Sequence, residues 1–143
     1  MDRINLITIG VRDLSASVEF YRNLGLEPSV MGHEEEIEIV FFRMKGSKLA
    51  LYPIEKLAAE TGHESGFVKG KFNGVTLAFN AKSEKEVDRI LKDVTNFGGE
   101  VIREAAPTEW GGYGGYFTDL DGYYWEVAYG SDWEFDENDM LLI

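Results

Sequence analysis

One carboxylate, Glu126, stands out among the side chains of this sequence that could do chemistry. It lies in a strand-like run at 124–129, and a loop of glycines and aromatics at 110–116 precedes that run. A carboxylate next to a cleft can act as a general base, as a ligand to a divalent metal, or as an anchor for a bound molecule. The partners that the rest of the chain supplies decide among these roles.

Five aromatic side chains and one histidine are candidates for a ligand-binding wall near this carboxylate. They are Trp110, Tyr113, Tyr116, Phe41, Tyr52 and His33. Aromatic residues on sheets often belong to the core, so each one taken singly also fits a structural role. The loop at 110–116 differs because its four glycines let the backbone approach closely or move. We expect it to form a lid or a pocket rim, and packing against a second subunit is the alternative.

Composition and charge exclude several classes of protein. The chain has 143 residues, which is enough for one domain or for two small halves that share a core. Its net charge of -12 repels phosphate backbones and anionic membranes, so we expect neither nucleic acid nor membrane as a partner. Cysteine is absent, and the N-terminal residues lack the basic and apolar regions of a signal peptide. We therefore expect a cytoplasmic protein.

Hydrophobic periodicity predicts the same order of elements twice. In the first half, strands are expected at 4–11, 26–31, 36–43 and 48–53, with a helix after Asp13 that ends at Gly25. In the second half, strands are expected at 74–80, 100–105, 113–119 and 124–129, with a helix that opens on a capping box at Ser83–Glu86 and ends at 98–99. The linker at 54–72 carries a short helical piece near 54–60, and an acidic tail follows at 131–143.

This repeat predicts an α+β fold made of two tandem βαβββ modules, at about 4–53 and 73–130, within a single domain spanning 1–143. A single curved sheet of this kind has an apolar face that it cannot bury alone. We therefore expect two curved mixed sheets to pair around a central cleft.

Three stretches resemble the vicinal oxygen chelate superfamily, which includes glyoxalase I, extradiol dioxygenases and bleomycin-resistance proteins. They are G-V-R-D-L-S-A-S-V-E-F-Y at 10–21, F-G-G at 97–99, and G-Y-F-T-D-L-D-G-Y-Y-W-E at 115–126. The resemblance covers about 4–130. It implies the glyoxalase/bleomycin-resistance/dioxygenase fold, a small-molecule ligand and a homodimer.

The resemblance also implies where a metal would be held. Metal-using members take one ligand from the first strand and one from the last strand of each half, usually two histidines and two glutamates. Carried over by motif, these positions fall on Leu6, Ala50, Gly74 (with Asn73 one residue away) and Glu126. Leucine, alanine and glycine side chains have no donor atom, and one carboxylate holds a divalent ion weakly. We therefore expect neither a metal at the usual position nor any other cofactor.

The histidines provide the alternative to that expectation. His33 lies at a strand end beside an acidic run, and His63 lies in the linker. Both fit surface positions. An unconventional site for Zn, Ni, Fe or Mn that uses one of them is the competing interpretation.

The sequence thus favours a protein that binds a small organic molecule in the cleft between the modules without the usual metal. The alternative is an enzyme of the same superfamily, such as an isomerase, a lyase or a dioxygenase-like protein. It would use Glu126 as a base or an unconventional divalent metal. A third class is an interaction module whose cleft is filled by side chains.

Overall fold

The computed structural model describes residues 2–33, 36–64, 69 and 71–143. The chain divides into two compact units, Met1–Val68 and Lys69–Ile143, and each is described by itself. Part of the predicted linker, 65–68 and residue 70, lies outside the described residues.

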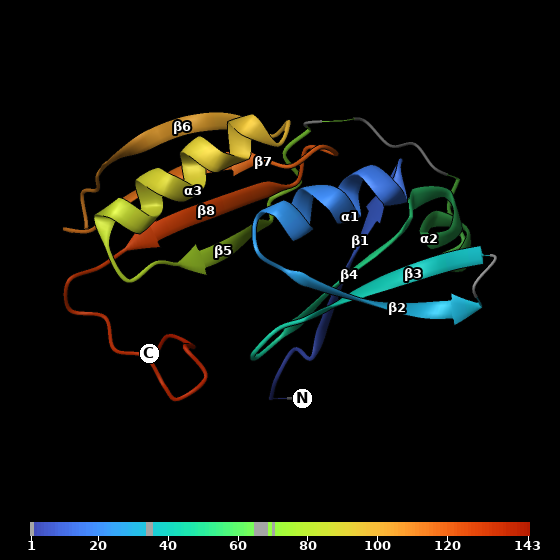
Figure 1. Cartoon of the computed structure of the whole chain (residues 1–143), viewed down its shortest axis with the longest axis horizontal. Coiled ribbons are helices and arrows are strands. Elements are labelled where there is room, and N and C mark those ends of the chain that lie inside the picture. The colour runs from blue at the N-terminus through green and yellow to red at the C-terminus, as the bar shows by residue number, and fades with distance from the viewer. Residues whose placement is uncertain (1, 34–35, 65–68, 70) are drawn as a thin grey trace. The chain divides into compact units, whose positions relative to one another are not determined.

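The described residues form eleven helices and strands, which are joined by turns and loops (Figure 1). In chain order they are β1 (Leu6–Val11), α1 (Leu14–Asn23), β2 (Glu27–His33), β3 (Glu36–Arg43), β4 (Lys48–Pro53), α2 (Ile54–Glu60), β5 (Thr76–Asn80), α3 (Glu84–Asn96), β6 (Glu100–Pro107), β7 (Tyr113–Thr118) and β8 (Tyr124–Tyr129). The predicted pair of tandem βαβββ modules is confirmed, since β1-α1-β2-β3-β4 and β5-α3-β6-β7-β8 repeat one order.

The first unit is a four-stranded mixed sheet in the order β1-β4-β3-β2, with β1 parallel to β4. The carboxylate of Asp13 accepts a hydrogen bond from the N–H of Ala16 at 2.9 Å, which caps the start of α1 as predicted. Phe20 and Tyr21 on this helix are buried, and the Tyr21 ring lies 5.7 Å from that of Phe42 on β3. These contacts attach α1 to the sheet.

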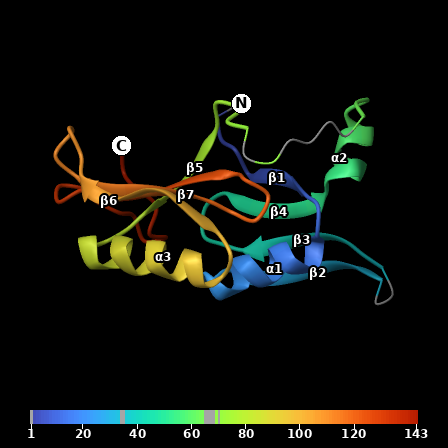
Figure 2. The same cartoon turned by 90° about the horizontal axis from the view of Figure 1, so that it is seen from above.

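The second unit repeats this topology in the order β5-β8-β7-β6. The helix α3 runs along the sheet and contacts β6, β7 and β8, as both views show (Figures 1 and 2). Its buried side chains Val87, Leu91 and Val94 follow the spacing of one helical face. This helix therefore covers one face of the sheet.

The capping box that the sequence predicts at α3 forms only in part. The Ser83 hydroxyl accepts from the N–H of Glu86 at 3.2 Å, as expected. The Glu86 carboxylate, however, accepts from the N–H of Lys82 at 2.9 Å instead of from that of Ser83. The bond still satisfies a backbone donor at the helix start, one residue earlier than the motif predicts.

Four strand ends differ from the prediction by two residues. The strand β1 begins at Leu6 instead of at residue 4. The strand β5 begins at Thr76, because Gly74 has φ +85° and the Asn73 side chain accepts from the N–H of Val75 at 3.1 Å, which makes a turn there. The strand β6 extends to Pro107 because its pairing with β7 continues to Tyr113. β2 extends to residue 33.

The C-terminal residues of the second unit form a small hairpin. Phe135 and Leu141 make an antiparallel bridge, and the Asp136 carboxylate accepts from the N–H of Met140 at 2.9 Å. Asp139 forms an ion pair with Lys82, just before α3. Among the described residues, no helix is long and apolar enough to cross a membrane.

Candidate functional site

Strand register places three candidate side chains in one row across the second sheet. Arg103 on β6 is paired with Tyr116 on β7, and Tyr116 is paired with Glu126 on β8. Directly paired residues of neighbouring strands point to the same face of a sheet. A guanidinium, a phenol and a carboxylate therefore lie side by side on one face.

This is the face that α3 does not cover. A Cβ atom added to Gly115 would lie 2.6 Å from Leu91 Cδ1, so position 115 faces the helix. Tyr116 is its neighbour on the strand and points the opposite way. The row formed by Arg103, Tyr116 and Glu126 thus lies on the face that α3 does not cover.

Small residues next to this row leave space above the sheet. Ala106, Gly114 and Ala128 form the adjacent paired row, and none of them has a side chain longer than a methyl group. Two residues lie between Arg103 and Ala106, whereas only one lies between their partners Tyr116 and Gly114 on β7, so β6 carries a bulge there. Bulges next to functional sites re-aim side chains, and this one sets Arg103 opposite Tyr116.

A tight loop between β6 and β7 forms the rim over this space. The N–H of Thr108 donates to the Gly112 carbonyl at 2.9 Å, and the Thr108 hydroxyl accepts from the N–H of Gly112 at 2.9 Å. Gly111 has φ +91°, a conformation that favours glycine. The loop is therefore closed on itself and presents Glu109 and Trp110 above the sheet.

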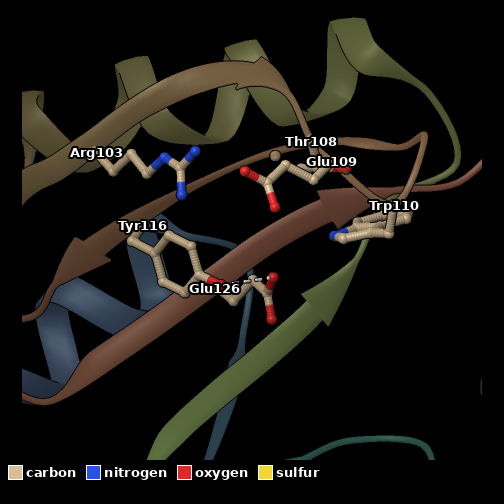
Figure 3. Close-up of a pocket in the computed structure, with 7 residues that line it drawn as sticks. Arg103, Thr108, Glu109, Trp110, Tyr116 and Glu126 are labelled. Atoms are coloured by element: carbon tan, nitrogen blue, oxygen red, sulfur yellow. Dashed lines mark hydrogen bonds between the residues drawn. The ribbon is translucent and has the colours of Figure 1, made fainter.

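The row and the rim enclose a pocket of about 330 Å³ in the second unit (Figure 3). It is lined by Arg103, Thr108, Glu109, Trp110, Gly114, Tyr116 and Glu126. In Figure 3 the guanidinium of Arg103 and the carboxylates of Glu109 and Glu126 point into the same space. This volume lies at the lower end of the range typical of small-molecule sites, about 300–1,000 Å³.

A hydrogen bond joins the phenol to the carboxylate. The Tyr116 hydroxyl donates to Glu126 Oε1 at 2.9 Å. Burial raises the pKa of Tyr116, the bond to Glu126 and its negative charge raise this pKa further, and the positive charge of Arg103 acts in the opposite direction. The phenol therefore remains a hydrogen-bond donor well above neutral pH.

The indole of Trp110 is supported from the C-terminal residues of the same unit. Its ring stacks on that of Trp133, with centroids 5.4 Å apart and an interplanar angle of 11°. Trp133 in turn packs on Gly130, where an added Cβ atom would lie 2.7 Å from the ring. The pocket rim is thus backed by a second tryptophan, and the residue Trp110 is still 54% exposed.

Three of the predicted site residues, Trp110, Tyr116 and Glu126, are brought together in this pocket. Tyr113 lies on the opposite face of β7, where its hydroxyl donates to Asp88 on α3 at 2.8 Å. That bond is the main cause of the raised pKa of Tyr113. Tyr113 is therefore a surface contact of the helix and does not line the pocket.

The remaining predicted residues belong to the first unit. Phe41 lies on β3, paired with Ala50, and Tyr52 on β4 donates its hydroxyl to Glu60 of α2 at 2.8 Å. His33 ends β2, paired with Glu36, and its side chain lies outside what the structure describes. His63 is exposed, and its Nδ1 lies 3.2 Å from the Thr61 hydroxyl.

The residues at the superfamily's metal-ligand positions do not fit a metal. Leu6 begins β1, Ala50 is fully buried on β4, and Gly74 lies in the turn before β5. None of the three offers a donor atom, so Glu126 is the one potential ligand of the set. Across the described residues, no group of three or more His, Cys, Asp or Glu side chains could hold a metal ion.

Three lining residues, Arg103, Thr108 and Glu109, are absent from the sequence-based candidates. The bulge in β6 breaks the alternation by which Arg103 could have been assigned to the face of Tyr116. Thr108 and Glu109 could have been found from their position, since they directly precede the glycine-aromatic loop that is expected to form a lid or a pocket rim.

Comparison with known proteins agrees with this architecture. Residues 3–127 match the family model of the Glyoxalase/Bleomycin resistance protein/Dioxygenase superfamily. No curated protein matches the chain. Among solved structures, a glyoxalase-related enzyme from Fulvimarina pelagi is 29% identical with a TM-score of 0.87, covering 100% of this chain and 99% of that one.

Two further structures show similar folds. A glyoxalase/bleomycin resistance protein/dioxygenase from Nocardioides is 25% identical with a TM-score of 0.73, covering 92% of this chain and 85% of that one. A lactoylglutathione lyase from Agrobacterium tumefaciens is 23% identical with a TM-score of 0.68, covering 94% and 98%, a likeness that shows the fold alone. With the family model matching most of its length, the chain belongs to the Glyoxalase/Bleomycin resistance protein/Dioxygenase superfamily.

Proposed function

We propose that this protein binds a small organic molecule in the pocket of the second unit without a metal at the superfamily's usual position. The observation that carries the proposal is the convergence of Arg103, Glu109 and Glu126 on one space, beside Trp110 and Tyr116. A concave site with an aromatic wall and a few convergent polar groups is typical of ligand pockets. Such a site can bind its ligand by non-covalent contacts alone, without catalysing a reaction.

The side chains at the metal-ligand positions support the metal-free part of this proposal. Glu126 is retained, but Oε1 is already bonded to the Tyr116 hydroxyl. Leu6, Ala50 and Gly74 cannot complete a coordination sphere around it. A lone carboxylate with a competing hydrogen-bond donor holds a divalent ion weakly.

Metal analysis and a binding screen test the two parts separately. Protein purified without chelators should contain less than about a tenth of an equivalent of Zn, Ni, Fe or Mn. A stoichiometric metal that is lost in Glu126→Gln would overturn the metal-free reading.

The screen measures thermal stabilisation by a set of small neutral, cationic, anionic and zwitterionic compounds. We expect at least one compound to raise Tm in the parent protein and to fail in Glu126→Gln. The matched control is Glu104→Gln, an exposed glutamate on β6 that does not line the pocket. If no compound stabilises the protein, or if both variants respond alike, the pocket is not the binding site.

The hydrogen bond between Tyr116 and Glu126 favours an enzyme as the second candidate. A phenol and a carboxylate 2.9 Å apart can exchange a proton with a substrate held over them. In that case Glu126→Gln would abolish turnover of a bound substrate and leave binding within a few-fold, because glutamine keeps the shape but cannot accept a proton. Unchanged turnover would remove Glu126 as the base.

We also propose that the protein is a homodimer, which the superfamily resemblance implies. Sedimentation equilibrium measures the mass in solution directly. A mass of one chain at micromolar concentration would contradict this part of the proposal.

A further inference from the structure

The pocket presents both signs of charge on separate walls. Arg103 contributes a cation from β6, whereas Glu109 on the rim and Glu126 on β8 contribute two carboxylates. Within the described part of the chain, the side chains of Arg103 and Glu109 take part in no hydrogen bond or ion pair. Glu126 engages one of its oxygens with Tyr116. The charged groups are thus available to a ligand.

This charge pattern selects against ligands of a single sign. An anion attracted to Arg103 meets two carboxylates a short distance away, on a chain whose net charge is already -12. A simple cation interacts with the carboxylates but leaves the guanidinium without a partner and repelled. A molecule that carries both charges satisfies both walls.

The uncharged part of the pocket indicates what joins the two charges. The exposed indole of Trp110 and the ring of Tyr116 border the same space. Aromatic walls favour flat or aromatic bodies and also stabilise a nearby ammonium group. The volume of about 330 Å³ limits the ligand to a small molecule.

We propose that the ligand of this pocket is a small zwitterion of the aminocarboxylate class with an aromatic or apolar body, whose carboxylate faces Arg103 and whose ammonium group faces Glu126 and Glu109. The inference rests on the proposed function, because it names the class of molecule for that same pocket. Arginine suits the carboxylate because its planar fork of donors matches two oxygens. The acidic pair suits a primary ammonium, which has three donors.

Three commercial compounds with the same phenylalkyl skeleton test the contribution of each charge separately. L-phenylalanine carries both, phenethylamine carries the cation alone, and 3-phenylpropionate carries the anion alone. Isothermal titration at neutral pH and low salt measures each dissociation constant. We expect L-phenylalanine to bind at least about tenfold more tightly than either single-charge probe, because each charged hydrogen bond contributes about this factor or more.

Two variants assign the charges to their walls. Arg103→Met should weaken L-phenylalanine at least about tenfold and leave phenethylamine unchanged or tighter, because a repelling cation is removed. Glu126→Gln should weaken L-phenylalanine and phenethylamine and leave 3-phenylpropionate unchanged or tighter. The control is Lys92→Met, which removes an equal charge from an exposed position on α3 and should leave all three constants within about twofold.

Each other result overturns the inference. Equal binding of the three probes, tightest binding of a single-charge probe, or an Arg103→Met effect on all probes alike contradicts the zwitterion. So does binding of none of the three. If compounds of the wider screen still stabilise the parent protein in a Glu126-dependent manner, only the ligand class is wrong. If no compound of the wider screen stabilises the protein either, both the ligand class and the proposed function are wrong.

Discussion

Replacing Gly115 with alanine tests whether the bulge in β6 is held in place by contact across the sheet. An added Cβ atom would lie 2.6 Å from the Arg103 carbonyl oxygen, 2.6 Å from Leu91 Cδ1 and 3.0 Å from the Ala105 nitrogen. The two 2.6 Å distances are shorter than real Cβ contacts, the 3.0 Å distance is tighter than most of them, and two of the three atoms belong to the backbone of the bulge. The strand β7 must therefore move away from β6 and from α3.

The expected cost follows from these contacts. Forcing an extra methyl group into a packed site costs about 1–3 kcal/mol, and the rigid backbone contacts at Gly115 place it near the middle of that range, about 2 kcal/mol. For a chain of this length such a change lowers Tm by about 4–8 °C. Urea denaturation should show the same loss with an unchanged m-value.

A double-mutant cycle identifies the cause. Leu91→Ala alone should cost about 2–5 kcal/mol, because it removes a buried side chain of α3. Combined with Gly115→Ala it removes one of the three clashes, so the double variant should be more stable than the sum of the single effects predicts by about 1 kcal/mol.

Gly111→Ala is the control for this cycle. Gly111 has φ +91° with no heavy atom within 4 Å of an added Cβ atom, so alanine there introduces backbone strain without a clash. Its cost should add to that of Leu91→Ala. A Gly115→Ala protein that melts within about 1 °C of the parent, or strict additivity with Leu91→Ala, would refute the packing argument.

Three further predictions concern the pocket and its rim. Because burial and the bond to Glu126 raise the pKa of Tyr116, Glu126→Gln should lower this pKa toward that of an ordinary tyrosine. Ultraviolet titration measures it, with Tyr116→Phe identifying which part of the absorbance change belongs to Tyr116. An unchanged pKa would contradict the assigned bond. The folded state also holds the phenolic proton of Tyr116 more tightly than the unfolded state does. The stability that this difference contributes is therefore present below about pH 10 and is lost as pH rises through the pKa of Tyr116 in the folded state. Tyr116→Phe should remove this contribution and flatten the alkaline part of the curve of stability against pH. Gly130→Ala should displace Trp133 and remove the exciton signal of the stacked Trp110 and Trp133 rings from the far-ultraviolet circular dichroism. Trp133→Ala should remove the same signal and serves as the control. A signal retained in Gly130→Ala would show that the position of Trp133 does not depend on that glycine.

Local signals in the sequence predicted most of the fold. The Asp13 cap and the helix start at Ser83 each depend on a few neighbouring residues, and each lies where those residues predict. Strand ends were less predictable, because they depend on how far a partner strand continues. That is why β6 reaches Pro107.

The site was predicted only in part, for two physical reasons. Tyr113 and Tyr116 are three residues apart, and on a regular strand an odd separation puts two side chains on opposite faces. Strand parity alone thus separates them, whereas the shared loop suggested a common role. Arg103 shows the reverse case, because the bulge that aims it at Tyr116 leaves no local mark in the sequence.

The repeat allows the candidate row of the second unit to be compared with its equivalent in the first unit. In the second unit the row across the sheet reads Ala78, Glu126, Tyr116, Arg103. The register of the first unit gives the equivalent row as Thr8, Ala50, Phe41, Ser29.

The two rows occupy the same places in the same topology but differ in chemistry. Where one has a carboxylate, a phenol and a guanidinium, the other has a methyl group, a phenyl ring and a small hydroxyl. Ala50 is fully buried, so a carboxylate at that position would need a donor to offset its desolvation, and Phe41 lacks the hydroxyl that Tyr116 supplies to Glu126. The first unit therefore lacks both the acid and the donor that would stabilise it. Of the two repeated sheets, the second carries a carboxylate, a phenol and a guanidinium in this row and the first carries no ionisable group, so we expect the ligand contacts on the second unit.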